Sequence, residues 1–245
     1  MRRAPIAVAL ALAAPATAQV DRAVLAGKLS ALADGGNAEA AYHLGMMRHL
    51  GIGGAKDDKA AFELFKKAAE AGDPLAAYKL GDYYAKPDNG QAEPDKAEAL
   101  RLKTIAAEAG YALAQYDVAK MHFDAEETDA ALEWLLRAAQ QGQPDALRAL
   151  ASLYNSDAIP KDAARTYAYY TLYLGRIATP TDKQKAFLTD LAAKMSAEDK
   201  TRGDRIVADW HVEQSDLTRK AAAGLRVAEA LAGMLPAKKE EPAGR

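Results

Sequence analysis

Apolar residues recur every three or four positions over most of the chain, which is the period of an amphipathic helix. Ala40, Leu44 and Met47 fall on one helical face, and the segment from Ala61 to Ala68 repeats this spacing further along. The pattern predicts helices in pairs, each pair with apolar faces that it cannot bury alone. Stacking of successive pairs would bury these faces, so we expect an all-α fold.

The helix pairs form an internal repeat. Four segments with the same opening pattern each start a first helix: Ala40–Gly45, Ala76–Gly81, Ala114–Ala119 and Ala146–Ala151. Three second helices close with Ala-Ala-Glu/Gln-x-Gly, and the steps from Gly36 through Gly72 and Gly110 to Gly142 are 36, 38 and 32 residues. Glycine adopts the left-handed conformation that ends many helices, and a proline suits the first turn of the next. The period predicts a solenoid.

Two further positions recur in the repeat. A small residue follows the apolar residue of each first helix, where it would allow two helix backbones to approach closely; these residues are Gly45, Gly81, Ala119 and Ala151. An acidic residue precedes each second helix, where it can cap the helix or complement its positive end; these are Asp57, Asp95, Glu127 and Asp162. Bulk at the small positions should disrupt the stack.

Together these motifs resemble the Sel1-like repeat family. The match is closest in the first unit, with Leu44-Gly45, Gly51-Ile52-Gly53, Asp57 and Lys67 to Gly72, although Arg48 stands where the family has tyrosine. Tetratricopeptide repeats are the near alternative, but the longer steps and the Ala-Ala-Glu-x-Gly ending favour the Sel1-like pattern. The resemblance covers about residues 36–178 and implies a right-handed α/α superhelical solenoid of Sel1-like (TPR-like) helix pairs.

The chain begins with a basic start, an apolar run and the small-x-small pattern Ala16-Thr17-Ala18. We interpret residues 1–18 as a signal peptide cleaved after Ala18, which predicts a periplasmic or secreted protein. A membrane anchor is the alternative, but the uncharged run from Ala4 to Ala18 contains two prolines and is shorter than the ~20 residues that spanning takes. The mature chain is therefore expected to have no transmembrane segment.

Further boundaries follow from the same patterns. Residues 19–36 are predicted to form a capping helix, and the four repeats to span about 37–72, 73–110, 111–142 and 143–178. Residues 179–235 should form C-terminal helices, with capping signals at Thr181 and Ser196 and one helix from Thr218 to Met234 that docks on the chain. The charged segment 236–245 is expected to be a disordered tail.

The composition argues against several classes of function. The chain has 32 Lys and Arg against 34 Asp and Glu, and a net charge of -2, so it lacks the basic field of a nucleic-acid binder. It has no cysteine, which excludes disulfides and thiolate chemistry. His43, His49, His122 and His211 show no metal-ligand spacing, and no nucleophile motif is present. We therefore expect no catalytic residue, metal or cofactor.

The first helices of such repeats line the concave side of a solenoid, and the family resemblance places eight residues there. These candidate partner-binding residues are Tyr42, Met46, Tyr78, Asp82, Tyr116, Lys120, Arg148 and Ser152. Tyrosine and arginine are common in binding hot spots, although the three tyrosines would also fit between helices. The resemblance implies a non-enzymatic scaffold or adaptor that binds a protein or peptide in the cell envelope, and a regulatory role is one that the family includes. The alternative is a cell-wall-related hydrolase or a muropeptide- or β-lactam-binding protein.

Overall fold

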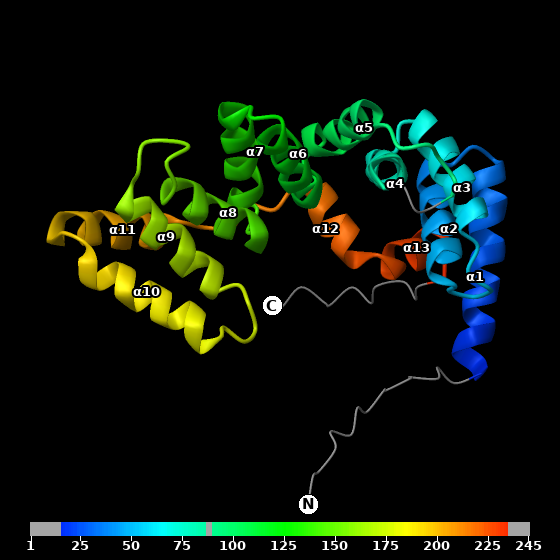
Figure 1. Ribbon diagram of the computed structural model, residues 1–245. Helices are drawn as coiled ribbons and strands as arrows, with labels where there is room; N and C mark the ends of the chain where they lie inside the picture. The colour runs from blue at the N-terminus through cyan, green and yellow to red at the C-terminus, as the bar shows by residue number, and fades with distance from the viewer. Residues whose placement is uncertain (1–15, 87–89, 235–245) are drawn as a thin grey trace, which may run out of the picture.

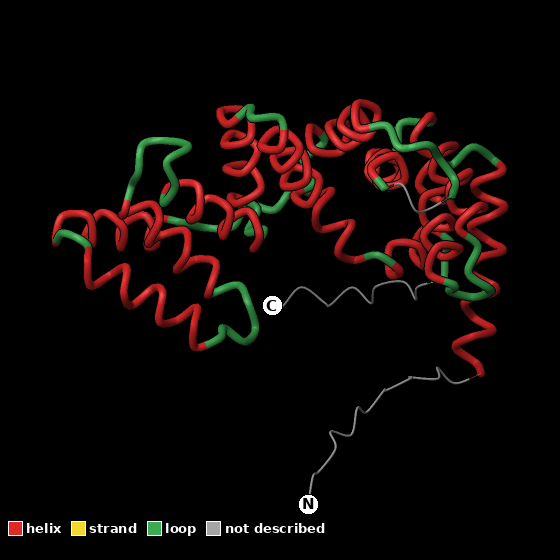
Figure 2. The backbone as a smooth tube through the Cα atoms, in the orientation of Figure 1, coloured by secondary structure: helices red, strands yellow, loops and turns green. Residues whose placement is uncertain are grey.

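The computed structural model describes residues 16–86 and 90–234, and within these ranges the backbone forms helices and loops without a strand (Figure 2). The first helix is α1 (Ala16–Asp34). Four helix pairs follow: α2 (Ala38–Leu50) with α3 (Asp58–Glu70), α4 (Pro74–Ala85) with α5 (Lys96–Glu108), α6 (Ala112–Asp124) with α7 (Thr128–Gln140), and α8 (Pro144–Tyr154) with α9 (Ala163–Leu174). The remaining helices are α10 (Asp182–Lys194), α11 (Ala197–Asp209), α12 (Asp216–Ala223) and α13 (Leu225–Leu231).

The helix pairs stack in chain order into an arch (Figure 1). Within each pair the two helices pack on each other, and the second helix of a pair packs on the first helix of the next. The α1 helix packs on α2 at one end of the arch. The predicted all-helical solenoid of stacked pairs is confirmed.

Local sequence signals set the helix ends. The side chains of Asp57, Asp95 and Asp162 accept hydrogen bonds from backbone N–H groups in the first turns of α3, α5 and α9, which satisfies donors that a helix start leaves unpaired. Glu127 does not cap α7 in this way; its carboxylate contacts the ring of His122 at 2.5 Å instead. The glycines that close the pairs adopt left-handed backbone conformations, as Gly72 shows with φ at 89°.

The small residues of the first helices lie where adjacent helices touch. A Cβ atom added to Gly45 would lie 2.8 Å from a ring carbon of Phe65, and one added to Gly81 would lie 2.9 Å from Cγ of Lys103. Real Cβ contacts of this length are essentially absent, so the neighbouring atoms of the second helix would have to shift. The expected close approach is therefore present in the first two repeats.

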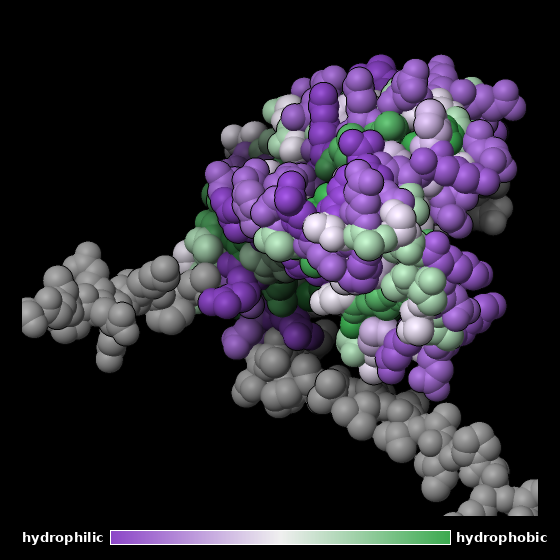
Figure 3. All heavy atoms as spheres, turned by 90° about the vertical axis from the view of Figure 1, so that its left-hand side faces the viewer, coloured by the Kyte–Doolittle hydropathy of each residue, from purple (hydrophilic) through white to green (hydrophobic). Residues whose placement is uncertain are grey.

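The α10 and α11 helices extend the arch beyond the fourth repeat. Thr181 begins α10 with the predicted capping box, in which Thr181 and Gln184 bond each other's backbone N–H groups. The α11 helix packs on α9, where Gly203 lies against the ring of Tyr167. The end of the molecule that carries α10 and α11 is mostly hydrophilic, and hydrophobic side chains show mainly where its surface is hollowed (Figure 3).

After α11 the chain turns back toward its own N-terminal end (Figure 1). Residues 211–234, which we call the C-terminal strap, run beneath the arch, and α13 contacts both α1 and α2. The predicted single helix from Thr218 to Met234 is wrong: Gly224, with φ at 47° and ψ at -113°, separates α12 from α13. The break turns α13 so that Ala228 is buried in the core of the first repeat, and the predicted docking on the chain is confirmed.

One glutamine holds the strap to the repeats. The Gln141 side-chain amide donates to the Gly110 carbonyl at 2.8 Å, while its oxygen accepts from the Ser215 N–H at 3.0 Å and the Thr218 hydroxyl at 2.7 Å. The Ser215 hydroxyl also donates to the Gly110 carbonyl, at 2.7 Å. Further along, Lys220 pairs with Glu39 of α2 at 2.7 Å. The strap therefore links the later repeats to the first one.

Some sequence-based expectations concern residues outside the described ranges. The expected signal peptide, 1–18, lies outside them except for its last three residues, with which α1 begins, and the expected tail, 236–245, lies outside them entirely. Among the described residues, no helix combines the length and the apolar character that crossing a bilayer demands.

Candidate functional site

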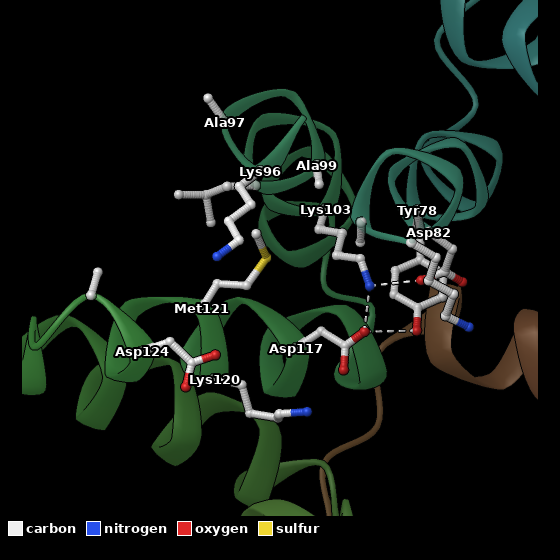
Figure 4. A pocket seen from close by; sticks show the side chains of 14 residues that line it. Tyr78, Asp82, Lys96, Ala97, Ala99, Lys103, Asp117, Lys120, Met121 and Asp124 are labelled. Carbon is white, nitrogen blue, oxygen red and sulfur yellow. Dashed lines mark hydrogen bonds and ion pairs between the residues drawn. The ribbon is translucent and has the colours of Figure 1, made fainter. Parts of the chain in front are cut away.

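Three recesses follow one another along the first helices of the repeats. The first, of about 140 Å³, lies between α2, α3 and α4. The second, of about 820 Å³, lies between α4, α5 and α6 (Figure 4), and shares Asp82 and Lys86 with the first. The third, of about 380 Å³, lies between α6, α7 and α8, and shares Lys120 and Asp124 with the second. Since neighbouring recesses share lining residues, they adjoin, and we call the three together the groove.

The groove contains most of the candidate residues that the family resemblance indicated. Its lining includes Tyr78, Asp82, Tyr116, Lys120, Arg148 and Ser152. Tyr42 and Met46 do not line it; both pack in the core that joins the first repeat to α1 and the strap. The structure thus brings six of the predicted side chains to one surface and places two elsewhere.

Two of the three tyrosines are core residues. Tyr42 is 9% exposed and Tyr78 is 6% exposed. The Tyr78 ring packs edge-on against Tyr111 with 5.1 Å between centroids, and its hydroxyl donates to Asp117 at 3.0 Å. Burial, followed by the nearby carboxylates, raises the pKa of Tyr78 well above its usual range. Tyr116 is half-buried at the third recess, so of the three it is the one that offers area to a ligand.

A buried charged cluster forms part of the second recess and was not predicted from the sequence. Lys103 of α5, 5% exposed, donates to Asp82 of α4 at 2.7 Å and to Asp117 of α6 at 2.6 Å. Figure 4 shows its amine between the two carboxylates and beside the Tyr78 hydroxyl. We call these four residues the Lys103 cluster. It connects two adjacent repeats through polar contacts.

The repeat itself contains the signal for this cluster. Lys103 is the eighth residue after the acid that begins its helix, and the same position holds Phe65 in the first repeat and Leu135 in the third, both buried. A lysine at an apolar repeat position is costly unless its charge is paired. Burial lowers the pKa of Lys103, but Asp82 and Asp117 outweigh burial, so its pKa is raised and the amine stays charged.

The third recess is apolar inside and charged at its rim. Its floor consists of Ala119, Leu135, Ala149 and Leu153, and its wall includes Phe123, which is 49% exposed. Lys120 and Arg148, both exposed, come from the first helices of adjacent repeats and stand beside it. An apolar cavity with few polar groups at its edge is the usual form of a side-chain or ligand pocket.

Two titratable groups that line the groove keep their protons at neutral pH. Its buried lysine and Tyr78 have raised pKa values, so both hold their protons at neutral pH. His49, at the first recess, contacts Asp58 at 2.8 Å. Over residues 16–86 and 90–234, no three His, Asp or Glu side chains converge in a way that would hold a metal ion.

Comparisons with known proteins identify the repeat. The Sel1 repeat matches residues 38–73, 74–111, 112–143 and 144–172, which is more than half of the chain. A Sel1 repeat protein from Oxalobacter formigenes has a similar crystal structure, with 24% identity, a TM-score of 0.57, and coverage of 79% of this chain and 77% of that one. A protective antigen of uropathogenic Escherichia coli strains with an SLR fold gives 18% identity and a TM-score of 0.48 over 93% of this chain and 57% of its own. No curated protein sequence matches the chain.

Proposed function

Because this chain belongs to the Sel1 repeat family, we propose that it is a non-enzymatic interaction protein that binds a protein or peptide partner in the groove. Sel1 repeats generally mediate contacts between proteins, and this solenoid carries a groove of three adjoining recesses. The observation that carries the proposal is that six of the eight side chains that the family resemblance indicated lie together along that groove.

The shape of the groove supports an extended partner. Recesses of about 820 and 380 Å³ fall within the size range of ligand sites, and they adjoin, so successive side chains of one peptide can enter both. The C-terminal strap packs on the first repeat, where α13 contacts α2 and Lys220 pairs with Glu39, and none of its described residues lines the three recesses. A partner can therefore enter the groove without displacing the strap.

The proposal includes a location in the cell envelope. Its support is the N-terminal sequence, a basic start followed by an apolar run and Ala16-Thr17-Ala18. Fractionation of cells that express the protein, with mass spectrometry of its N-terminus, tests this part. We expect a mature chain that begins at Gln19 in the periplasm or the medium; an intact Met1 in the cytoplasm would contradict it.

Affinity capture from crosslinked cells tests the binding role. The groove variant changes Lys120→Glu and Phe123→Ala, two exposed positions, and the control changes Lys59→Glu and Lys66→Glu, exposed on α3 away from the groove. Circular dichroism first confirms equal helicity. We expect the wild type and the control to recover the same partner and the groove variant to lose it. Equal recovery by all three proteins would refute the groove assignment.

A further inference from the structure

The charge of the groove is opposite to that of the whole chain. The chain has more acidic than basic residues, 34 against 32. The groove lining instead has twice as many basic as acidic side chains. The basic ones are Lys79, Lys86, Lys96, Lys103, Lys120 and Arg148, and the acidic ones are Asp82, Asp117 and Asp124.

Two of the three groove carboxylates are already neutralised within the fold. Asp82 and Asp117 both accept from Lys103, and Asp117 also accepts from the Tyr78 hydroxyl. Lys79 adds a second positive charge, 3.6 Å from Asp82. Together the two lysines balance the charge of the two carboxylates before a partner arrives. The Lys103 cluster makes these acids part of the wall rather than a repulsive surface for an anionic ligand.

Three of the basic side chains, Lys96, Lys120 and Arg148, are exposed at the groove. Lys96 and Lys120 are exposed, and neither forms an ion pair with another described residue. Lys96 extends from α5 toward α6 across the second recess (Figure 4). Arg148 pairs with Asp145 at 3.3 Å, but both side chains are about half exposed, and such a pair is weak enough to exchange for another carboxylate.

From this arrangement we infer that the groove recognises an acidic peptide segment with one large apolar side chain. This inference rests on the proposed function and specifies its partner. The carboxylates of the peptide lie along Lys96, Lys120 and Arg148, and its apolar side chain enters the third recess, between Phe123 and Leu153. Charge complementarity of this kind raises the association rate and rejects basic partners.

A peptide fits the groove better than a nucleic acid does. The backbone of a nucleic acid carries an evenly spaced row of phosphates. Asp124 lies beside Lys120 in the shared wall of two recesses, where it would repel such a row. A peptide can place its acidic residues on either side of Asp124 and present a neutral residue to it.

Selection from a random library of displayed 12-residue peptides tests the inference on the purified full chain. The charge variant is Lys120→Glu with Arg148→Glu, and the control is Lys59→Glu with Lys66→Glu, which makes the same change of charge on α3. We expect the wild type and the control to enrich acidic peptides that share one large apolar residue. The charge variant should bind the synthesised peptides at least about tenfold more weakly.

Further variants and conditions test the apolar and the ionic contributions to binding separately. Ser152→Trp places a bulky side chain at the exposed edge of the third recess, so it should weaken binding, as should alanine in place of the apolar residue of the peptide. Raising the salt concentration should weaken binding further. Enrichment of basic or neutral peptides that still depend on Ser152 would overturn the acidic preference and leave the proposed function intact. Peptides that bind all variants equally, or no enrichment, would overturn both, and stronger binding of a single-stranded oligonucleotide would overturn the peptide preference.

Discussion

Replacing Lys103 with methionine should destabilise the protein although methionine is the more apolar residue. The substitution removes two charge-assisted hydrogen bonds, to Asp82 at 2.7 Å and to Asp117 at 2.6 Å. It leaves two carboxylates facing each other across a position that the amine had occupied. Removing one partner of a buried ion pair leaves an uncompensated charge in the fold, and this destabilises the fold more than burial of the apolar methionine stabilises it.

The size of the destabilisation depends on how exposed the two carboxylates are. Removal of one partner from a fully buried ion pair costs about 3–5 kcal/mol. The side chains of Asp82 and Asp117 are 24% and 23% exposed, so water recovers part of that cost. We therefore expect Lys103→Met to lower the free energy of unfolding by about 2 kcal/mol. With a urea m-value of about 2 kcal/mol/M, the midpoint should fall by about 1 M.

The triple variant Lys103→Met, Asp82→Asn, Asp117→Asn provides the control. It removes the unpaired charges and keeps the acceptor for the Tyr78 hydroxyl, so we expect it to recover at least about 1 kcal/mol. The assay is urea unfolding followed by circular dichroism and by tryptophan fluorescence, with coincident curves as the condition for a two-state fit. Unchanged or raised stability of Lys103→Met would refute the reasoning, as would a triple variant weaker than the single one.

Three further predictions concern packing, the strap and pH. Gly45→Ala should cost about 1–3 kcal/mol because its Cβ would lie 2.8 Å from the ring of Phe65, whereas Gly27→Ala, with no atom within 4 Å, should be neutral or stabilising in urea unfolding. Gln141→Ala should cost about 1–3 kcal/mol and speed hydrogen exchange in residues 211–234, since it removes the bonds that hold the strap; unchanged exchange would contradict this. Burial, the largest effect, lowers the pKa of His43, so the unfolded chain binds this proton more readily than the folded chain. The free energy of unfolding should therefore fall as pH drops below about 6.5. The variant His43→Gln should show a weaker dependence on pH, and an unchanged dependence would refute the role of His43.

The sequence predicted those parts of the fold that depend on neighbouring residues. The caps at Asp57 and Asp162 and the turns at the repeat glycines involve residues a few positions apart, so a short motif specifies them. The register of the repeat then placed Tyr116 with Arg148, and Lys120 with Ser152, on one surface, because equivalent positions of stacked units face the same side.

The strap depends on contacts that no local pattern encodes. The Ser215 hydroxyl bonds the carbonyl of Gly110, which lies 105 residues earlier in the chain. The break between α12 and α13 had a local signal in Gly224, but the apolar residues on both sides continue a helical period and favour a single helix. The break is stabilised by the packing of α13 on α1 and α2, which is a tertiary contact and therefore has no local sequence signal.

The Lys103 cluster could have been predicted in part. Comparison of Lys103 with Phe65 and Leu135 at the same repeat position marks it as an exception to an apolar pattern. Its two partners could not be chosen in this way, because Asp82 and Asp117 belong to different helices whose side-chain directions depend on how the pairs stack. The tyrosines show the same limit: Tyr78 and Tyr116 occupy equivalent positions, yet Tyr78 is buried and Tyr116 half-exposed.

Site-specific photo-crosslinking tests the groove as the binding surface most directly. Benzoylphenylalanine replaces Lys120 or Ser152, both exposed in the groove, and Lys66 of α3 as the control position, in cells that express the protein. Our account predicts that one partner protein crosslinks from both groove positions and not from position 66. Crosslinks to the same partner from position 66 alone, or from all three positions equally, would contradict it.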